Sequence, residues 1–259
     1  MGDLLTIENL SLLHAGRSLV SGVSLSVSAG ERVGLIGESG SGKSLTALAA
    51  IGLLPEGMTA TGSVLLADRQ VIGAADRDVV NLRGTAVATI FQEPLTALDP
   101  LMRIGDQIAE VVRRRARRDG HSLSRADLIA EVIGLMARVA LPNPARLARA
   151  YPHEMSGGQR QRAAIAMALA CRPSLLIADE PTTALDVTTQ AEVLKLLEAL
   201  VREDNMGLLF ISHDLPVVGT AVDRVLVLRA GELVEEGPVA EVFCRPRHPY
   251  TVGLVEAAR

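Results

Sequence analysis

Residues 37–44 read Gly-Glu-Ser-Gly-Ser-Gly-Lys-Ser and directly follow the apolar run Arg32–Ile36. Glycines let such a loop curl until successive backbone N–H groups face one centre, and the helix that follows adds the positive end of its dipole. Lys43 is placed to reach the β- and γ-phosphates of a nucleotide, and the Ser44 hydroxyl to ligate Mg²⁺. A plain glycine turn is the alternative, but a strand, a full GxxxxGKS match and a helix in this order favour a nucleoside-triphosphate site.

A second apolar run, Leu175–Ala178, ends in the adjacent acids Asp179 and Glu180. An unpaired buried carboxylate is costly, so acids at the end of a buried strand indicate a nearby cation. Asp179 suits the Mg²⁺ shell, and Glu180, one residue on, is placed to polarise an attacking water. Two solvated acids at a strand end are the alternative, which the phosphate loop upstream makes less favourable.

Short apolar runs alternate with helical patterns along the chain, which predicts an α/β fold built on a mostly parallel sheet. The first two strands predict a small antiparallel N-terminal sheet. The expected strands are Leu4–Leu10, Val23–Val27, Arg32–Ile36, Val64–Leu66, Val87–Phe91, Leu175–Ala178, Gly207–Ile211 and Arg224–Leu228. The expected helices are Ser44–Leu54, Gln159–Ala170 and Gln190–Arg202.

A charged helical stretch interrupts this alternation, with its helical periodicity running from Ile104 to about Val139. We therefore expect one domain with an inserted helical subdomain. The expected parts are a nucleotide-binding core at 1–92 and 166–235, the helical insertion at 93–165, and a C-terminal tail at 236–259.

Bulk composition fits a soluble protein, and if this protein meets a membrane, it does so through a partner. Apolar residues make up 48% of the 259 residues, but no run reaches the ~20 residues that span a bilayer. The opening Met-Gly-Asp-Leu-Leu-Thr-Ile-Glu lacks the pattern of a signal peptide. Cys171 and Cys244 form no metal-spaced array, which fits a reducing cytoplasm, and a net charge of −4 gives no general attraction to nucleic acid.

Residues 156–159 read Ser-Gly-Gly-Gln, inside the run Tyr151-Pro-His-Glu-Met-Ser-Gly-Gly-Gln-Arg-Gln-Arg162 and before a helical pattern. With the phosphate loop upstream, the chain resembles the ATP-binding subunit of an ABC transporter over essentially its whole length. The resemblance implies an ATPase with ATP and Mg²⁺ as its ligands. It also implies that Ser156, Gly157, Gly158 and Gln159 form the signature motif, which completes the ATP site of a neighbouring subunit. Met155 replaces the commoner Leu, a volume-conserving change.

The same resemblance assigns roles to three more segments. Gln92, in Ile-Phe-Gln-Glu-Pro, matches the glutamine loop that links the metal site to the helical insertion. Ala184-Leu-Asp186 matches the loop that crosses the dimer interface. His213, in Phe-Ile-Ser-His-Asp, matches the histidine that contacts the γ-phosphate, whereas His121 is expected to be an ordinary surface residue.

Two positions depart from the family pattern. Leu45 stands where many members have Thr, so its N–H is still available to the α-phosphate but a side-chain bond is lost. His14 falls where an aromatic residue stacks on adenine, and it is equally compatible with a solvated turn. The full set expected to contact nucleotide is Gly37, Glu38, Ser39, Gly40, Ser41, Gly42, Lys43, Ser44, Leu45, His14, Ser156, Gly157, Gly158, Gln159 and Asp186, with Ser44, Gln92 and Asp179 around the metal.

Five segments look like the dipeptide/oligopeptide/nickel importer group, and the first of its two paired ATPases fits best. These segments are Gly37–Thr46, Ile51–Pro55, Phe91–Pro100, Tyr151–Ser156 and Arg247–Thr251. The resemblance implies import of peptides, nickel or metal chelates, and the short C-terminal end is closer to the nickel and metallophore members. It implies a paralogous ATPase partner or a homodimer, two permease subunits and, indirectly, an external solute-binding protein, at the cytoplasmic face of the membrane.

Other functional classes lack their expected features. A soluble ABC ATPase of translation or DNA repair would show two cassettes or a long coiled coil, and a nonhydrolytic cassette would lose Glu180 or His213. A small-molecule kinase would not need the signature motif, while an exporter or another cargo stays an alternative.

Two further segments invite a functional reading. The five arginines within 113–118 cover most faces of a helix, which favours solvation over a lipid or nucleic-acid site. A membrane subunit is expected to dock on a group of apolar residues early in the helical insertion. The alternative is that these residues pack inside the insertion. They are Leu95, Leu98, Leu101 and Met102.

Overall fold

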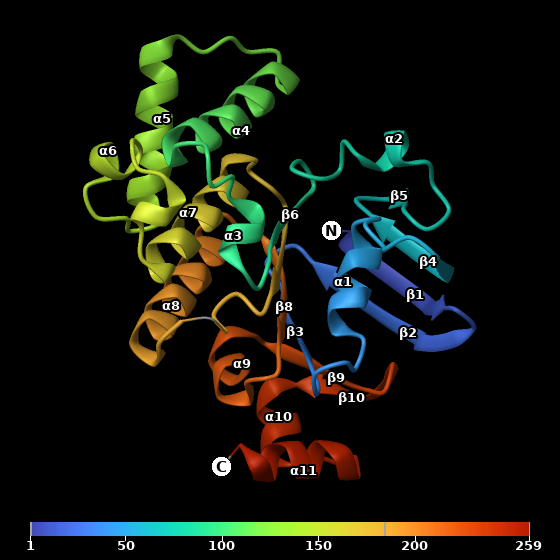
Figure 1. Ribbon diagram of the computed structural model, residues 1–259. Coiled ribbons are helices and arrows are strands. Elements are labelled where there is room, and N and C mark those ends of the chain that lie inside the picture. Colours follow the sequence, from blue (N-terminus) through green and yellow to red (C-terminus); the bar gives the residue numbers. More distant parts are fainter. Residues whose placement is uncertain (1, 184, 259) are drawn as a thin grey trace. The chain divides into compact units, whose positions relative to one another are not determined.

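The structure is a computed structural model that describes residues 2–183 and 185–258. The chain divides into two compact units (Figure 1). The first unit is made from Met1–Val87, Ser174–Glu180 and Glu198–Arg259, and the second from Ala88–Pro173 and Pro181–Leu197. Over the described ranges, none of the helices combines the length and apolar character needed to cross a membrane.

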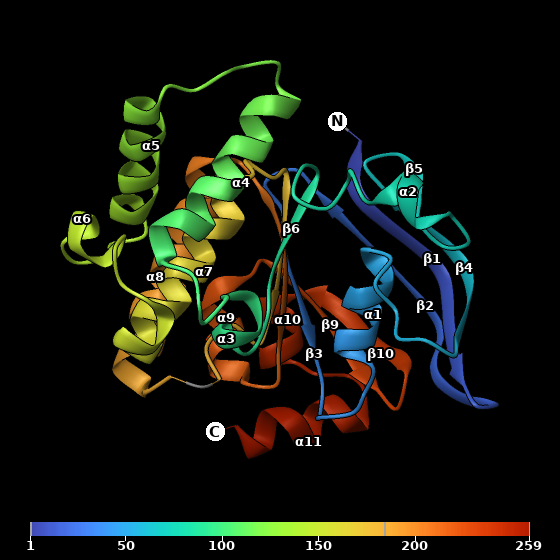
Figure 2. The same ribbon diagram turned by 45° about the horizontal axis from the view of Figure 1, so that its top comes forward.

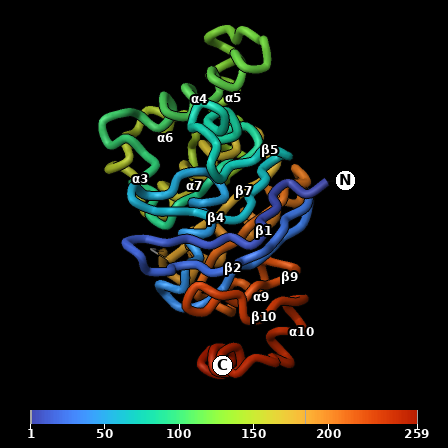
Figure 3. The backbone as a smooth tube through the Cα atoms, turned by 90° about the vertical axis from the view of Figure 1, so that its right-hand side faces the viewer, coloured from blue at the N-terminus to red at the C-terminus, as the bar shows by residue number. Residues whose placement is uncertain are grey.

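The smaller sheet of the first unit is antiparallel, with the order β2-β1-β4-β5 (Figure 3). Its strands are β1 (Asp3–His14), β2 (Arg17–Ser28), β4 (Met58–Leu66) and β5 (Arg69–Gln70). The expected N-terminal antiparallel sheet is confirmed, but β1 and β2 are longer than predicted. Asn9 has a φ of 50°, and the pairing with β2 shifts between Ile7 and Leu10. This bulge breaks the alternation of apolar residues on which a strand prediction depends.

The larger sheet carries β10, β9, β3, β8 and β7 in that order within the first unit. The strands are β3 (Arg32–Ile36), β7 (Leu175–Asp179), β8 (Gly207–Ser212), β9 (Arg224–Arg229) and β10 (Glu232–Pro238). β3 pairs in parallel with β8 and β9, and β7 in parallel with β8, while β10 is antiparallel to β9. Every residue of β8 is buried, as expected for a strand covered on both faces. The mostly parallel sheet is therefore confirmed.

The core of the first unit joins both sheets to α1 (Lys43–Ala50). Leu5 and Ile7 of the small sheet, Leu35 and Ile177 of the large one, and Ala47 of α1 belong to one buried cluster. Burial of each large aliphatic side chain contributes ~1.5–3 kcal/mol. The unit also contains α2 (Asp76–Val79), α9 (Leu215–Ala221), α10 (Val239–Cys244) and α11 (Pro249–Ala257). The core fixes the strand ends from which the loops of the site emerge.

The chain enters the second unit within β6 (Val87–Ile90), and this unit is mainly helical (Figure 2). Its elements are α3 (Pro94–Ala97), α4 (Ile104–Arg118), α5 (Arg125–Arg138), α6 (Pro144–Leu147), a 3-10 turn at Pro152–Glu154, α7 (Gly157–Ala170) and the start of α8 (Val187–Glu203). α4, α5 and α7 pack against one another. Ile108 and Val112 of α4 and Met136 of α5 are fully buried, which accounts for the helical periodicity in the sequence.

The arginine run in α4 is less uniform than expected. Four of its arginines are exposed, which agrees with a solvated face. Arg115 is 7% exposed and forms an ion pair of 2.7 Å with Glu131 of α5. It also donates a hydrogen bond of 3.2 Å to the carbonyl of Ala170, at the end of α7. Arg115 thus joins three helices of the second unit. For this residue, the prediction of a solvated side chain is wrong.

Candidate functional site

The phosphate loop follows β3 and leads into α1, and two of its glycines are required by close approach. Gly37 has a φ of 149°, and a Cβ there would lie 2.1 Å from the Leu228 carbonyl oxygen. Gly42, at the start of α1, has a φ of 102°, and its Cβ would lie 2.9 Å from Cγ2 of Val20. Any side chain at either position would force the loop away from its neighbours. The sequence identifies these glycines by pattern, but only the fold shows what they contact.

Lys43 is buried beneath the loop and bonded to it. Its Nζ donates to the carbonyl oxygens of Gly37 and Glu38, each at 2.8 Å. Burial lowers the pKa of Lys43, while the carboxylates of Glu180, Asp179 and Glu38 act in the opposite direction. The ammonium group is therefore held by backbone carbonyls, with the carboxylates offsetting part of the cost of its burial. A nucleotide phosphate arriving above it would strengthen the charged form further.

The mouth of the loop is open to solvent. Glu38, Ser39, Gly40 and Ser44 are exposed, whereas Ser41, Gly42 and Lys43 beneath them are buried. Backbone N–H groups of a helix start and its preceding loop form a favourable site for a phosphate. The exposed rim leaves room for a ligand above a buried cation.

Asp179 ends β7 and fits a divalent cation. Burial raises the pKa of Asp179, and nearby Glu180 raises it further, while the Ser44 hydroxyl and Lys43 act in the opposite direction. Its Oδ1 is buried and accepts no hydrogen bond from residues 2–183 or 185–258. A buried carboxylate oxygen without a partner is costly unless a cation occupies the space beside it. Carboxylate and hydroxyl oxygens are ligands that Mg²⁺ accepts, so Asp179 and Ser44 together fit this ion.

Glu180 and His213 follow neighbouring parallel strands and contact each other. Nδ1 of His213 lies 2.9 Å from Oε1 of Glu180, within hydrogen-bond distance. The Glu180 side chain is 14% exposed and that of His213 is 51% exposed. Glu180 has a φ of 46°, and its N–H donates to the Ile211 carbonyl at 2.9 Å. A left-handed backbone is unusual for glutamate and tends to occur where a site requires it. Neither this conformation nor the contact follows from the sequence pattern.

The Ser-Gly-Gly-Gln segment lies in the second unit, at the start of α7. Ser156 and Gln159 form a capping box: the Gln159 N–H donates to Ser156 Oγ at 3.3 Å, and the Ser156 N–H donates to Gln159 Oε1 at 3.1 Å. Ser156 and Gly157 are exposed. Sequence reasoning singled out these residues as a signature motif, and the structure adds that the same residues define where the helix begins. The exposed helix start is suited to an anion.

Asp186 lies in the second unit near the same segment, because Thr189 links them. Asp186 accepts hydrogen bonds from the Thr189 N–H at 3.0 Å and from its hydroxyl at 2.7 Å. Hydrogen bonds from the Thr189 backbone and then from its side chain lower the pKa of Asp186. A Cβ on Gly158 would lie 2.4 Å from Cγ2 of Thr189, so this glycine allows a close approach. Sequence reasoning missed Thr189, although Asp186 and Thr189 have the spacing of a helix N-cap residue and the third residue of its helix.

The remaining predicted positions are more dispersed. Gln92 is exposed in the second unit, just after β6. His14 is exposed at the end of β1 in the first unit, opposite Arg17 and Met58 of the neighbouring strands. Leu45 is half-buried in α1. Ala184, in the predicted interface loop, lies outside the described residues.

The first unit therefore gathers Lys43, Ser44, Asp179, Glu180 and His213, and the second gathers the signature residues with Asp186. A phosphate loop after one parallel strand and an acid pair after another define a phosphate-loop nucleoside triphosphatase. The family model described as "ABC transporter" matches residues 20–183, and the chain belongs to this family. It is an ATPase of the ATP-binding cassette type.

Relatives of known name agree with this assignment. A Brucella ovis ATP-binding protein named for peptide import is 48% identical over 245 residues, which cover 92% of this chain and 71% of that protein. The glutathione import ATP-binding protein GsiA of Escherichia coli O157:H7 is 42% identical over 271 residues, which cover 99% of this chain and 42% of GsiA. The chain thus spans less than half the length of GsiA.

Solved structures share the fold. The ATP-binding cassette MJ0796, in a dimeric post-hydrolysis state bound to ADP and Pi, has a TM-score of 0.78 and 29% identity over 91% of this chain and 98% of that one. The cbiO1 subunit of an ABC transporter complex from Clostridium perfringens has a TM-score of 0.79 and 25% identity over 95% of this chain and 92% of that one. These likenesses confirm the cassette fold.

Proposed function

We propose that this chain is the ATP-hydrolysing motor subunit of an ABC importer for peptides. The observation that carries the proposal is the juxtaposition of a buried phosphate-loop lysine, an unpartnered aspartate oxygen and a glutamate bonded to a histidine. The importer assignment is supported by relatives named for peptide and glutathione import. The same relatives do not favour a soluble non-transport ATPase or an exporter.

The chain's residues divide the work of hydrolysis among them. Lys43, held beneath the loop by its bonds to the Gly37 and Glu38 carbonyls, reaches the β- and γ-phosphates. Ser44 and Asp179 hold Mg²⁺, with Gln92 as a further candidate ligand, and the bound ion would neutralise charge on the phosphate oxygens. Glu180 orients and polarises the attacking water. His213 fixes the Glu180 carboxylate through their 2.9 Å contact and reaches toward the γ-phosphate.

The signature residues serve a second ATP site, completed by another cassette. Ser156 and Gly157 are exposed at a helix start, as a donor surface for a phosphate on a partner chain requires. A dimeric structure of the related cassette MJ0796 supports this arrangement. We favour a paralogous ATPase as the partner, with a second copy of this chain as the alternative.

The cargo is assigned by likeness to relatives. Peptides, including glutathione, are the cargo in the names of the relatives, whereas nickel and metal chelates are supported only by the sequence resemblance. We place the chain at the cytoplasmic face of the membrane, bound to two permease subunits that receive cargo from an external solute-binding protein.

Reconstituted transport tests the proposal. The chain, a paralogous ATPase and a permease pair are incorporated into proteoliposomes with ATP on the cassette side and the solute-binding protein on the other. Uptake of radiolabelled peptides is expected, and it should cease with Glu180→Gln. Uptake of ⁶³Ni²⁺ or a nickel chelate but of no peptide would replace the peptide assignment with the metal one. ATP hydrolysis with neither uptake would contradict the importer assignment.

A further inference from the structure

The C-terminal segment reaches the phosphate loop through Tyr250. The Tyr250 hydroxyl accepts a hydrogen bond of 2.9 Å from the backbone N–H of Glu38, across 212 residues of sequence. Tyr250 lies in the first turn of α11, whereas Glu38 directly follows the first glycine of the loop. The mechanism proposed above assigns no role to this tyrosine.

The peptide group that Tyr250 binds is the same one that Lys43 binds. The N–H of Glu38 and the C=O of Gly37 belong to a single planar peptide unit. Its carbonyl oxygen accepts a bond of 2.8 Å from Lys43 Nζ, and its N–H donates to Tyr250. One rigid plane is thus held from both ends, and its orientation sets one of the two carbonyls that hold the lysine. A rotation of this plane would move the Lys43 contact and the start of the loop together.

The tyrosine is itself held firmly. The Arg229 guanidinium lies over its ring, 5.1 Å from the centroid, and its backbone N–H donates to Nδ1 of His248 at 3.2 Å. Burial raises the pKa of the Tyr250 phenol, so the hydroxyl stays neutral. A neutral hydroxyl accepts the Glu38 N–H and still has a proton to donate.

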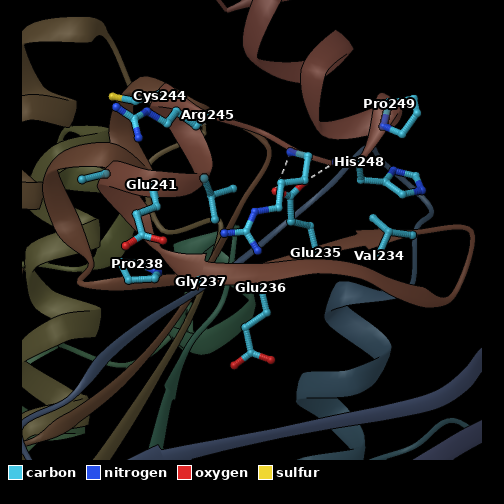
Figure 4. A pocket seen from close by; sticks show the side chains of 13 residues that line it. Val234, Glu235, Glu236, Gly237, Pro238, Glu241, Cys244, Arg245, His248 and Pro249 are labelled. Carbon is cyan, nitrogen blue, oxygen red and sulfur yellow. Dashed lines mark hydrogen bonds between the residues drawn. The ribbon is translucent and has the colours of Figure 1, made fainter.

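The turn before α11 is fixed by hydrogen bonds to Glu235. This carboxylate of β10 accepts the backbone N–H of Arg247 at 2.8 Å and that of His248 at 3.0 Å (Figure 4). Burial alone would raise the pKa of Glu235, but the hydrogen bonds it accepts outweigh burial and lower the pKa. A hollow of about 1080 Å³ adjoins this turn, lined by β10, α10 and the residues up to Pro249. The turn therefore depends on these bonds more than on apolar packing along that side.

We propose that Tyr250 is a positioning residue for the phosphate loop, which sets the Gly37–Glu38 peptide and through it Lys43 for binding ATP. The inference rests on the proposed ATP site and extends it to the C-terminal segment. Glu235 and His248 hold the tyrosine in place, so β10, the turn and α11 act as a brace for the loop. The expected effect falls on ATP binding and not on the chemical step, because the contacts of Tyr250 are with Glu38, His248 and Arg229 and not with the acids that end β7.

Tyr250→Phe removes only the hydroxyl and tests the proposal directly. With the purified full chain, binding of a fluorescent ATP analogue and steady-state hydrolysis are measured for wild type, Tyr250→Phe and Tyr151→Phe. Tyr151, the matched control, lies in the second unit with its ring stacked on His153. Tyr250→Phe should weaken binding and raise KM by about 3- to 10-fold, as the loss of one hydrogen bond implies, with kcat within about twofold. Tyr151→Phe should leave nucleotide binding unchanged.

Amide hydrogen exchange supplies a second readout that a general loss of stability would not imitate. Without nucleotide, Tyr250→Phe should speed exchange at the Glu38 amide while leaving β8 protected. Unchanged ATP affinity and unchanged Glu38 exchange would overturn the positioning role, as would an equal loss of affinity in Tyr151→Phe. Lys43→Ala distinguishes failure of the proposed ATP site from failure of the role of Tyr250. If Lys43→Ala leaves ATP affinity unchanged, the ATP site is wrong. If Lys43→Ala weakens ATP binding and Tyr250→Phe does not, only the positioning role of Tyr250 is wrong.

Discussion

His213 and Glu180 meet at the carboxyl ends of two adjacent parallel strands, with Nδ1 of His213 2.9 Å from Oε1 of Glu180. A carboxylate only accepts hydrogen bonds, so Nδ1 carries the proton in this contact. The imidazole thereby orients the one acid of the site that has a left-handed backbone. Two residues that the sequence separates by 33 positions are thus in direct contact.

Glu180→Gln should leave ATP affinity within about threefold and reduce turnover by roughly 10²- to 10³-fold, because the amide keeps the shape of the side chain but loses its charge. Binding is measured by fluorescence titration and turnover by phosphate release. Lys43→Ala is the contrasting variant and should weaken binding first. A Glu180→Gln chain with near-normal turnover would remove Glu180 from the chemistry.

Asp179→Asn should stabilise the nucleotide-free chain while weakening Mg²⁺-dependent ATP binding. Burial raises the pKa of Asp179 in the folded state above its value in the unfolded state. Asp179 therefore contributes its full stabilisation below the unfolded-state pKa, and this stabilisation is lost as pH rises through the folded-state pKa. At neutral pH the charged form is therefore unfavourable, and the amide should raise Tm by about 2–4 °C.

The control for this change is Asp186→Asn, because the pKa of Asp186 is shifted in the opposite direction. Hydrogen bonds from Thr189 lower the pKa of Asp186, so its contribution to stability is lost as pH falls through the folded pKa. Replacement at neutral pH should give no increase in Tm. Thermal unfolding at pH 7 and pH 5, with and without Mg²⁺-ATP, checks both variants. A fall in the Tm of nucleotide-free Asp179→Asn would contradict the cation site.

Arg115→Ala should destabilise the chain by about 1–3 kcal/mol, since it leaves partly buried Glu131 with only its longer 3.4 Å ion pair to exposed Arg172 and removes the bond to the Ala170 carbonyl. Arg117→Ala, at an exposed position in the same helix, should change stability by less than about 0.5 kcal/mol. Urea unfolding of both variants makes the comparison. If both variants lost the same free energy of unfolding, the ion pair of Arg115 with Glu131 would contribute nothing to stability.

The isolated chain should be mostly monomeric without nucleotide, because the sealed ATP site needs a second cassette. Light scattering measures the mass with and without ATP, using Glu180→Gln to prevent turnover, and with the paralogous ATPase added. The mixed pair should associate only when ATP is present. A tight homodimer without ATP would remove the support for a paralogous partner.

The proposed docking set for a membrane subunit now divides into two kinds of residue. Leu101 is 87% exposed, whereas Leu98 is 2% exposed. Leu101→Glu should therefore uncouple transport while leaving basal ATP hydrolysis within about twofold, and Leu98→Glu should instead lower Tm, since it buries a charge. Paired uptake and ATPase measurements in proteoliposomes decide the question. Full transport by Leu101→Glu would place the docking surface elsewhere.

The sequence predicts the parts of the site that depend on local pattern. β3 has the predicted bounds because its apolar run is buried on both faces, and Asp179 is recognisable because it ends a second such run. Nearly every strand of the larger sheet can be predicted from such an apolar run. β10 was missed because this edge strand has three glutamates and little buried surface, so its sequence has no apolar run that predicts a strand.

Long-range contacts and special backbone conformations could not be predicted. The left-handed φ of Glu180 depends on the N–H bond to Ile211, and the requirement for Gly158 depends on Thr189. Both partners come from elsewhere in the chain. Tyr250 was recognised only as part of a family segment, with no indication that it touches the phosphate loop.

The bond between Glu38 and Tyr250 also orders events during synthesis. The phosphate loop leaves the ribosome 212 residues before the tyrosine that holds it, so the loop is first made without its brace. A chain that stops short of residue 250 has every residue of the phosphate loop but not the bond that fixes its first peptide. By the proposed role of Tyr250, tight nucleotide binding requires a chain that extends past residue 250, and affinity for ATP reports whether α11 is in place.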